Sequence, residues 1–405
     1  KHGDHIEKEE LTVSLSLNRE ISAIVPSASM VTMAKAKKLK AVDAEIVDLA
    51  GGEPDFDTPR KICDERFRQI NAGYTHYTVG NGLPELREKI AAKLRAENGC
   101  AGYDADSVIV TPGGKYAIYI AVRAVVNPGD EVMYLTPGWV SYPAIAQAAG
   151  GVSVAVPLDP DGGYRITEEA LEAKVTSKTR LLIVNYPNNP TGRVLTRPEA
   201  EILRGFMLRH PDVVLLSDEM YEKILYDGNE NISPASCADI APRVVTVNGF
   251  SKCVAMTGWR IGYLAASPEI VRVAGKLFQH TISCTSGFIQ KAAAMAFECG
   301  EEIEAMRRTY QERRDFFVGG LNAVPGVHCE LPEGAFYAWT KFDLPGMDSN
   351  QGGEYILNNA KVVGVPGVSY GEEKGCWMRF SFATDDAQLR RAVENIARMM
   401  KGLKK

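Results

Sequence analysis

Short apolar runs alternate with helical stretches through the middle of the chain, and this alternation constrains the fold most strongly. Each run is rich in β-branched residues and is followed by Gly, Pro, Asn or Asp, as buried strands of parallel sheets are. The pattern predicts an α/β fold whose large domain has three layers and a mostly parallel central sheet. The predicted strands are 107–110, 131–135, 152–156, 180–184, 213–216 and 244–247. The predicted helices are 83–98, 115–126, 198–210 and one long helix over 288–321.

The pattern changes beyond residue 321, where Gly and Pro punctuate two predicted strands, 334–339 and 377–382. A terminal helix is predicted from Asp386 onward. These elements indicate a smaller α+β domain built from both chain ends. We predict four segments along the chain: an N-terminal extension over 1–20, an N-terminal part of the small domain over 21–60, the large domain over 61–320 and the C-terminal small domain over 321–405.

Composition excludes several classes of function. The 405 residues carry a net charge of -5, which argues against nucleic acid or an anionic membrane as the main partner. No apolar run approaches the roughly 20 residues that a bilayer crossing needs. The first ten residues are highly charged and lack the apolar core of a signal peptide. Eight cysteines are scattered without a C-x-x-C pair, which is typical of reduced thiols. We therefore expect a cytoplasmic protein with no metal site.

Several predicted strands end in residues suited to ligand binding, and ligands of open α/β sheets bind at the carboxyl ends of the strands. Gly113 and Gly114 open a predicted helix, where backbone N–H groups and the helix dipole suit a phosphate. Trp139 follows the next strand and could stack on a flat ring. Asn189 lies in a rigid Asn/Pro turn after a later strand. The plain alternatives are a tight turn for the glycines and core packing for Trp139.

The last two strands of the series deliver an acid, a phenol, a lysine and an arginine. If a helix begins at Asp218, that residue and Tyr221 share one face of it, although Asp218 could merely cap such a helix. Lys252 lies in a Gly/Ser turn, where its amine could form an imine with an aldehyde or simply be solvated. Arg260 offers a planar fork for a phosphate, with a surface salt bridge as the alternative.

Together these groups complement pyridoxal 5′-phosphate. The cofactor presents a phosphate, a flat ring, a phenolic oxygen, a pyridine nitrogen and an aldehyde. A carboxylate beside the pyridine nitrogen keeps the ring protonated and electron-withdrawing. A lysine holds the aldehyde and, once displaced by a substrate amine, can move the α-proton. The set thus indicates an enzyme acting on amino acids.

Sequence motifs spread from about residue 20 to residue 400 resemble those of the fold-type I pyridoxal-phosphate aminotransferases of class I and II, and in particular the bacterial-type aspartate aminotransferases. The match keeps the motifs in the family's order, which makes it highly specific. The matching segments are 48–56, 76–87, 139–143, 187–192, 217–221, 251–263 and 378–383.

The resemblance implies roles around the cofactor ring. Lys252 corresponds to the Schiff-base lysine and Asp218 to the acid at the ring nitrogen. Tyr221 and Asn189 correspond to the contacts of the 3-oxygen, and Trp139 to the stacking ring. Lys252, Asp218 and Tyr221 are therefore the expected catalytic residues.

The resemblance also implies how the phosphate is held and how subunits combine. Gly113, Gly114 and Arg260 correspond to phosphate contacts, and Tyr77 to a residue that reaches the site from the other subunit of a homodimer. The substrate α-carboxylate is expected to meet Arg379, with the Gly52 backbone helping. Asn189 completes this expected carboxylate site. A bidentate guanidinium is the usual carboxylate clamp, although a surface ion pair is the alternative for a strand arginine.

Substrate choice rests on fewer residues. Lys115, Ser27 and Ser29 occupy the positions that meet the substrate's side-chain carboxylate in the resembling enzymes, which favours aspartate and glutamate. The sequence departs from the family at Gly249, where a hydroxyl residue is common, and at Gly138, which could widen the pocket. The stretch 279–287 also matches poorly. A specialised substrate, or elimination, cyclisation or oxidation with the same cofactor, is the alternative. A ligand-binding regulator with this fold is a second one, which the intact lysine disfavours.

Overall fold

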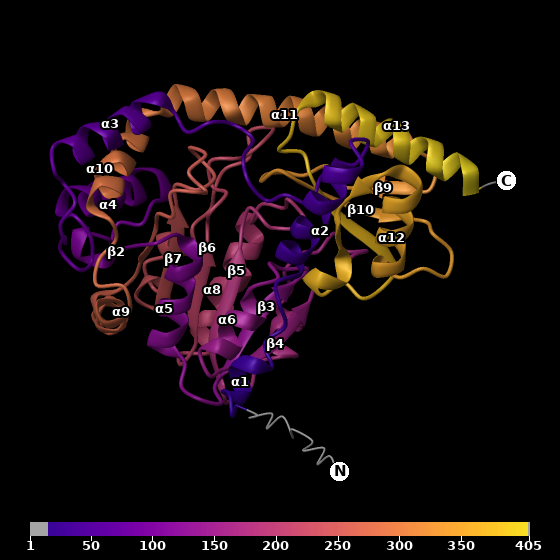
Figure 1. The fold of residues 1–405 in the computed structure, drawn as a ribbon. Helices are drawn as coiled ribbons and strands as arrows, with labels where there is room; N and C mark the ends of the chain where they lie inside the picture. Colours follow the sequence, from indigo (N-terminus) through magenta and orange to yellow (C-terminus); the bar gives the residue numbers. More distant parts are fainter. Residues whose placement is uncertain (1–14, 404–405) are drawn as a thin grey trace, which may run out of the picture.

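The computed structural model describes residues 15–403, and the predicted mostly parallel sheet is its centre (Figure 1). Seven strands follow the order β2-β8-β7-β6-β5-β3-β4. All neighbours are parallel except those of β8, which is antiparallel to both β2 and β7. The strands are β2 (Val108–Thr111), β3 (Glu131–Thr136), β4 (Val152–Pro157), β5 (Thr179–Asn185), β6 (Val214–Asp218), β7 (Val244–Gly249) and β8 (Gly262–Ala265).

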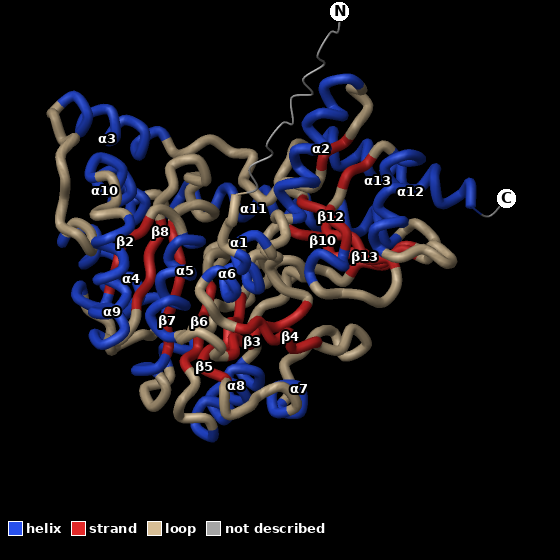
Figure 2. The backbone as a smooth tube through the Cα atoms, turned by 60° about the horizontal axis from the view of Figure 1, so that its bottom comes forward, coloured by secondary structure: helices blue, strands red, loops and turns tan. Residues whose placement is uncertain are grey.

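Helices cover both faces of this sheet, which confirms the three-layer arrangement (Figure 2). Side chains alternate along each strand: Leu181 and Ile183 of β5 pack with the core of α5, α6 and α9, whereas Leu182 and Val184 pack with that of α4 and α8. Fully apolar strands result, because both faces are buried. The helices of this part are α3 (Arg60–Asn71), α4 (Pro84–Asn98), α5 (Gly114–Val125), α6 (Tyr142–Ala148), α7 (Glu168–Glu172), α8 (Arg197–Arg209), α9 (Pro268–Thr281) and α10 (Gly287–Ala293).

A second, antiparallel sheet lies in the C-terminal part, with the order β12-β13-β10-β9. A segment from the N-terminal part and one from the C-terminal part of the chain meet beside it, because β1 (Val47–Asp48) pairs in parallel with β11 (Val362–Val363). This pairing confirms that the smaller α+β part uses both ends of the chain. The strands are β9 (Val327–Cys329), β10 (Tyr337–Phe342), β12 (Val365–Pro366) and β13 (Cys376–Ser381). The remaining helices are α1 (Arg19–Ser22), α2 (Ala28–Val42), α11 (Gly300–Asn322), α12 (Ser349–Ala360) and α13 (Asp386–Leu403).

The structure differs in three details from the sequence-based interpretation. The long helix over 288–321 is broken by the 3-10 segment Ala294–Glu298, and α11 starts afresh at Gly300, where glycine weakens helix formation. The strand β8 was missed, because its four residues follow a Gly-rich motif. No helix begins at Asp218: this residue ends β6 and a turn follows.

The four predicted segments stay predictions, and residues 1–14 of the expected extension lie outside the described residues. Figure 1 shows α11 running along one edge of the molecule, from the helices around the large sheet to α13. Among the helices of residues 15–403, none has the length and apolar content that a bilayer crossing requires.

Candidate active site

A cavity of about 310 Å³ lies at the carboxyl ends of the sheet strands, between them, α2 and β13. Twelve of the fourteen predicted site residues line it. Those twelve are Ser27, Ser29, Gly52, Gly114, Lys115, Trp139, Asn189, Asp218, Tyr221, Lys252, Arg260 and Arg379. Gly113 adjoins this wall through Arg260, whereas Tyr77 lies elsewhere.

Lys252 projects into the cavity from the turn after β7. Its Nζ donates a hydrogen bond to the carbonyl oxygen of Gly52 and lies 5.8 Å from the ring centroid of Tyr221. Burial lowers the pKa of the Lys252 amine to about 8, and the cations Arg379 and Arg260 push it the same way, although Glu53 opposes them. A larger share of the amine is therefore neutral and nucleophilic at neutral pH than in an ordinary lysine.

Asp218 occupies the last position of β6 and is held by two donors. The Tyr142 hydroxyl donates to its Oδ2 at 2.8 Å, and the Met220 backbone N–H donates to its Oδ1 at 3.2 Å. Burial raises the pKa of Asp218 to about 6, despite these hydrogen bonds and the charge of Lys252. A buried carboxylate in this state gains from a cationic partner in the cavity.

Tyr221 lies three residues beyond Asp218, in the turn. Its hydroxyl is 2.6 Å from that of Tyr337, a residue of β10 in the second sheet. Burial raises the pKa of Tyr221 well above its usual value, so the phenol stays protonated. The hydroxyl therefore enters the site as a neutral hydrogen-bonding group.

An anion seat forms where α5 begins. Gly113 precedes the helix with φ +87°, and a Cβ built on it would lie 2.5 Å from Nη2 of Arg260, so only glycine allows this approach. Arg260 itself has φ +55°, which is uncommon for a residue with a side chain and marks a position held by its surroundings. The N-terminus of α5 and the guanidinium thus converge, while the Gly113 N–H itself donates to the Thr111 carbonyl oxygen at 2.7 Å.

Arg379 is set into the opposite wall. Its guanidinium donates to Asn189 Oδ1 at 3.1 Å and to the Ala50 carbonyl oxygen at 2.6 Å, and it lies 4.4 Å from the ring centroid of Tyr337. The buried Nε has no hydrogen-bond partner within the described chain. Buried donors without partners are rare, so Arg379 is suited to an incoming carboxylate.

Lys115 and Trp139 lie beside each other, with Nζ 4.9 Å from the ring centroid. Burial lowers the pKa of Lys115, and Arg260 adds to the effect. Ser27 and Ser29 approach from α2, where Ser27 is the N-cap residue and the buried Ser29 Oγ has no partner within residues 15–403. These groups leave hydrogen-bonding capacity on this side of the cavity.

The lining is strongly cationic. Lys115, Lys252, Arg260 and Arg379 all line the cavity, and none forms a salt bridge within residues 15–403. Two carboxylates, Glu53 and Asp218, line it as well. Buried cations are usually paired, so a cavity with this excess suits a ligand that carries several negative charges.

Sequence reasoning missed several contributors. Tyr142 holds Asp218, Tyr337 contacts both Tyr221 and Arg379, and Asn185 donates to the Asp218 carbonyl oxygen at 2.9 Å. Tyr142 lies in the same motif as Trp139 and could have been found by that spacing. Tyr337 carried no such signal, because it comes from the other sheet.

Two departures from the family have backbone causes. A Cβ on Gly249 would lie 2.8 Å from the Gly262 Cα, so β7 and β8 leave no room for a hydroxyl side chain. A Cβ on Gly138 would clash with the Leu135 carbonyl oxygen, and Gly138 does not line the cavity, so it does not widen the pocket. Ser251 lines the wall beside Lys252 instead.

Tyr77 is 89% exposed and belongs to a separate hollow, which it shares with Cys284, Ser286 and Gly287. The poorly matching stretch 279–287 and Tyr77 thus lie on one surface. The described chain by itself does not bring Tyr77 to the cavity.

Comparisons with known proteins show the family of this chain. The family model described as aminotransferase class I and II matches residues 44–396. The aspartate aminotransferase of Musicola paradisiaca is 38% identical over 384 residues, which cover 94% of this chain and 96% of that protein. The aspartate/prephenate aminotransferase of Cereibacter sphaeroides is also 38% identical, with 96% and 99% covered.

Solved structures show the same likeness. The aspartate aminotransferase of Thermus thermophilus with maleate superposes with a TM-score of 0.90 at 37% identity, covering 95% of this chain and all of that one (100%). The Rhizobium meliloti aspartate aminotransferase gives 0.91 at 36% identity, with 96% and 99% covered. With the family model, the relatives' identity and the fold in agreement, this chain belongs to the class I and II aminotransferases, which are transaminases dependent on pyridoxal 5′-phosphate.

Proposed function

We propose that this aminotransferase moves amino groups between aspartate or glutamate and a 2-oxo acid. The excess of unpaired cations in one cavity carries the proposal. A cofactor phosphate and a substrate with two carboxylates would together provide negatively charged partners for Arg260, Arg379 and Lys115.

The lining residues fit the cofactor group by group. Gly113, Gly114 and Arg260 would hold the phosphate, and Lys252 would hold the aldehyde. Trp139 would stack on the ring, as a half-buried aromatic at the cavity wall. When bound, the cofactor withdraws electrons from the substrate α-carbon.

Three residues of the chain would tune that chemistry. Asp218, fixed by Tyr142, would keep a proton on the ring nitrogen, and Tyr221 and Asn189 would hydrogen-bond the ring oxygen. Once a substrate amine has displaced it, the Lys252 amine would take the proton from the substrate α-carbon and later give that proton up at another atom. Its lowered pKa suits this role.

The substrate carboxylates would bind at opposite walls. Arg379, oriented by Asn189, would clamp the α-carboxylate near the Gly52 backbone. Lys115, with Ser27 and Ser29, would meet the side-chain carboxylate. The relatives named above are an aspartate aminotransferase and an aspartate/prephenate aminotransferase, and the Thermus thermophilus structure holds maleate, a dicarboxylate. Both facts support an acidic substrate here.

A homodimer is part of the proposal. Tyr77 and the stretch 279–287 lie together on the surface, so a second copy could bring Tyr77 to this cavity. The eight cysteines are all free, which supports a reducing, cytoplasmic location.

Half-reactions with single substrates test the proposal. The cofactor-loaded enzyme is mixed with one amino acid at a time, and the absorbance of the cofactor aldehyde is followed in a stopped-flow instrument. Aspartate and glutamate should remove that absorbance faster than neutral amino acids, and oxaloacetate or 2-oxoglutarate should restore it. If no 2-oxo acid restores it, the reaction is not a transamination. If neutral amino acids react faster, the substrate proposal is wrong.

A further inference from the structure

The turn after β6 presents two kinds of side chain to opposite sides. Asp218 and Tyr221 line the cavity, whereas Glu219 and Glu222 point away from it toward α4. The turn is tight, since the Glu222 N–H donates to the Glu219 carbonyl oxygen at 3.0 Å. Glu219 and Glu222 are thus next in sequence to Asp218 and Tyr221, within one hydrogen-bonded turn.

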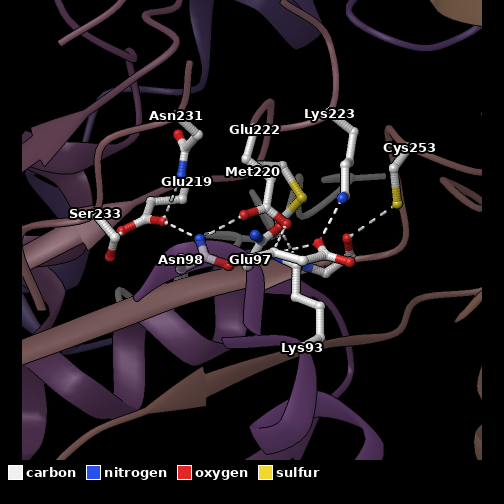
Figure 3. Close-up of polar contacts among 12 residues, drawn as sticks. Lys93, Glu97, Asn98, Glu219, Met220, Glu222, Lys223, Asn231, Ser233 and Cys253 are labelled. Carbon is white, nitrogen blue, oxygen red and sulfur yellow. Dashed lines mark hydrogen bonds and ion pairs between the residues drawn. The ribbon is translucent and has the colours of Figure 1, made fainter. Parts of the chain in front are cut away.

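Asn98, the last residue of α4, joins the two glutamates. Its Nδ2 donates to Glu219 Oε2 at 3.0 Å and to Glu222 Oε2 at 2.8 Å, and its Oδ1 accepts from Lys93 Nζ at 2.7 Å (Figure 3). Lys93 also pairs directly with Glu222. One amide thus uses both of its donors and its carbonyl oxygen to tie helix and turn together.

The far end of the cluster is equally well bonded. Glu219 accepts from the hydroxyls of Ser233 at 2.6 Å and Ser217 at 3.1 Å, and from Asn231 Nδ2 at 3.1 Å. Burial raises the pKa of Glu219 to about 7, and the charge of Glu222 adds to it. Burial acts in the same direction on Glu222, but Lys93 outweighs it and the pKa of Glu222 is lowered.

These groups are almost fully withdrawn from solvent. Glu219 is 1% exposed, Asn98 6%, and Glu222 and Lys93 9% each. Buried ion pairs add little net stability compared with apolar packing, so stability alone gives no reason to keep one here. Their documented use is to specify one arrangement of the chain, and the arrangement specified here carries two residues of the cavity wall.

We propose that Lys93, Asn98 and Glu222 are positioning residues for the cofactor. Together with Glu219 they hold the turn that sets Asp218 and Tyr221 against the cofactor ring. The inference rests on the proposed roles of Asp218 and Tyr221. Lys93, Asn98 and Glu222 do not line the cavity, yet by this inference they influence how the cofactor binds.

Glu222→Gln tests the inference, because it removes the charge that pairs with Lys93 and keeps the size of the side chain. The matched control is Glu97→Gln, the same change at the exposed end of the network, where Glu97 pairs with Lys223 at 2.5 Å and only distantly with Lys93, at 3.9 Å. For each variant three quantities are measured: the thermal midpoint without cofactor, the dissociation constant of pyridoxal 5′-phosphate, and the pH midpoint at which the bound cofactor changes its absorbance.

We expect Glu222→Gln to weaken cofactor binding about tenfold and to shift the absorbance midpoint by about half a pH unit or more. Glu97→Gln should change the dissociation constant by less than about twofold and leave the absorbance midpoint in place. A fall in the thermal midpoint with unchanged affinity and absorbance would overturn the inference, and so would equal effects of the two variants.

Two further variants keep the outcome interpretable. Ser233→Ala removes one hydrogen bond to Glu219 and a weak one from the Cys100 thiol, and it should fold even if Glu222→Gln does not. It should weaken cofactor binding about twofold to threefold, and an unchanged affinity counts against the inference. Asp218→Asn is measured in parallel. If it leaves the absorbance midpoint unchanged, the proposed role of Asp218 fails. If Asp218→Asn shifts the midpoint and neither cluster variant does, only the positioning inference fails.

Discussion

The two ends of the cavity are built in different ways. The cofactor end, with Asp218 and Lys252, comes from successive strand ends of one sheet, and the chain's own donors already hold Asp218. The substrate end, with Arg379 and Ser29, combines β13 and α2, and leaves Arg379 Nε and Ser29 Oγ without partners in the described chain. The cofactor end is preorganised for a group that stays bound. The substrate end keeps unpaired hydrogen-bonding atoms for a ligand that binds and is released in each cycle.

Loss of Lys252 should have the largest effect, and it should not depend on the substrate. Lys252→Ala removes the amine that takes the α-proton, so kcat should fall roughly 10⁴-fold or more with every amino acid. Steady-state assays with aspartate, glutamate and a neutral amino acid measure this.

The control is the neighbouring Cys253→Ser. Burial raises the pKa of the Cys253 thiol to about 12, and Sγ contacts the Gly249 carbonyl oxygen, so the residue packs rather than reacts. Its activity should stay close to that of the unaltered enzyme. Full activity of Lys252→Ala would break the distinction between the two ends.

Arg379→Ala should come next and should affect binding and turnover together. The clamp both binds the α-carboxylate and orients the substrate, so KM should rise and kcat should fall, and kcat/KM should drop about 10²- to 10³-fold. Cofactor affinity, measured by titration, should change little. An unchanged kcat with a raised KM would show that Arg379 binds substrate without orienting it.

Lys115→Met should have a smaller effect that depends on the substrate. Removing a charged hydrogen-bond donor should lower kcat/KM for aspartate roughly 10- to 100-fold. The kcat/KM for alanine as substrate should fall much less, because alanine has no side-chain carboxylate. Alanine therefore serves as the internal control. Equal losses with both substrates would place Lys115 at the cofactor end instead.

The pH dependence of cofactor capture should be the finest test. Because the pKa of Lys252 is lowered from 10.5 to about 8, its neutral amine becomes abundant as pH rises through 8, and the rate of aldehyde capture by the cofactor-free protein should level off above that point. The folded pKa lies below the unfolded one, so the unfolded chain binds more protons between the two values. The free energy of unfolding should therefore rise from about pH 8 to pH 10.5.

Glu53→Gln sharpens this test. Glu53 is the carboxylate that most raises the pKa of Lys252, so its neutralisation should move the midpoint of capture below pH 8. The control Glu45→Gln changes an exposed glutamate that does not line the cavity. A midpoint near 10.5 in the unaltered protein would mean that Lys252 is not desolvated.

Much of the fold could be predicted from sequence, because each buried strand of a parallel sheet is a short apolar run. The strand β8 and the break before Gly300 could not, because a four-residue strand and a single turn of 3-10 helix lack a readable period. Residues at strand ends, such as Asp218 and Trp139, were found by their place after a run. Tyr337 was not, since nothing in its local sequence indicates contact with Tyr221.

The sequence alone indicated the α/β class, the cofactor and the set of groups around Lys252, because apolar runs and the residues that follow them are local patterns. Tertiary structure alone decided that Arg379 meets Asn189, that Gly138 is a backbone requirement and that Asn98 of α4 joins Glu219 to Glu222. These contacts join residues far apart in the chain. Their distances depend on how sheets and helices pack, which no local pattern encodes.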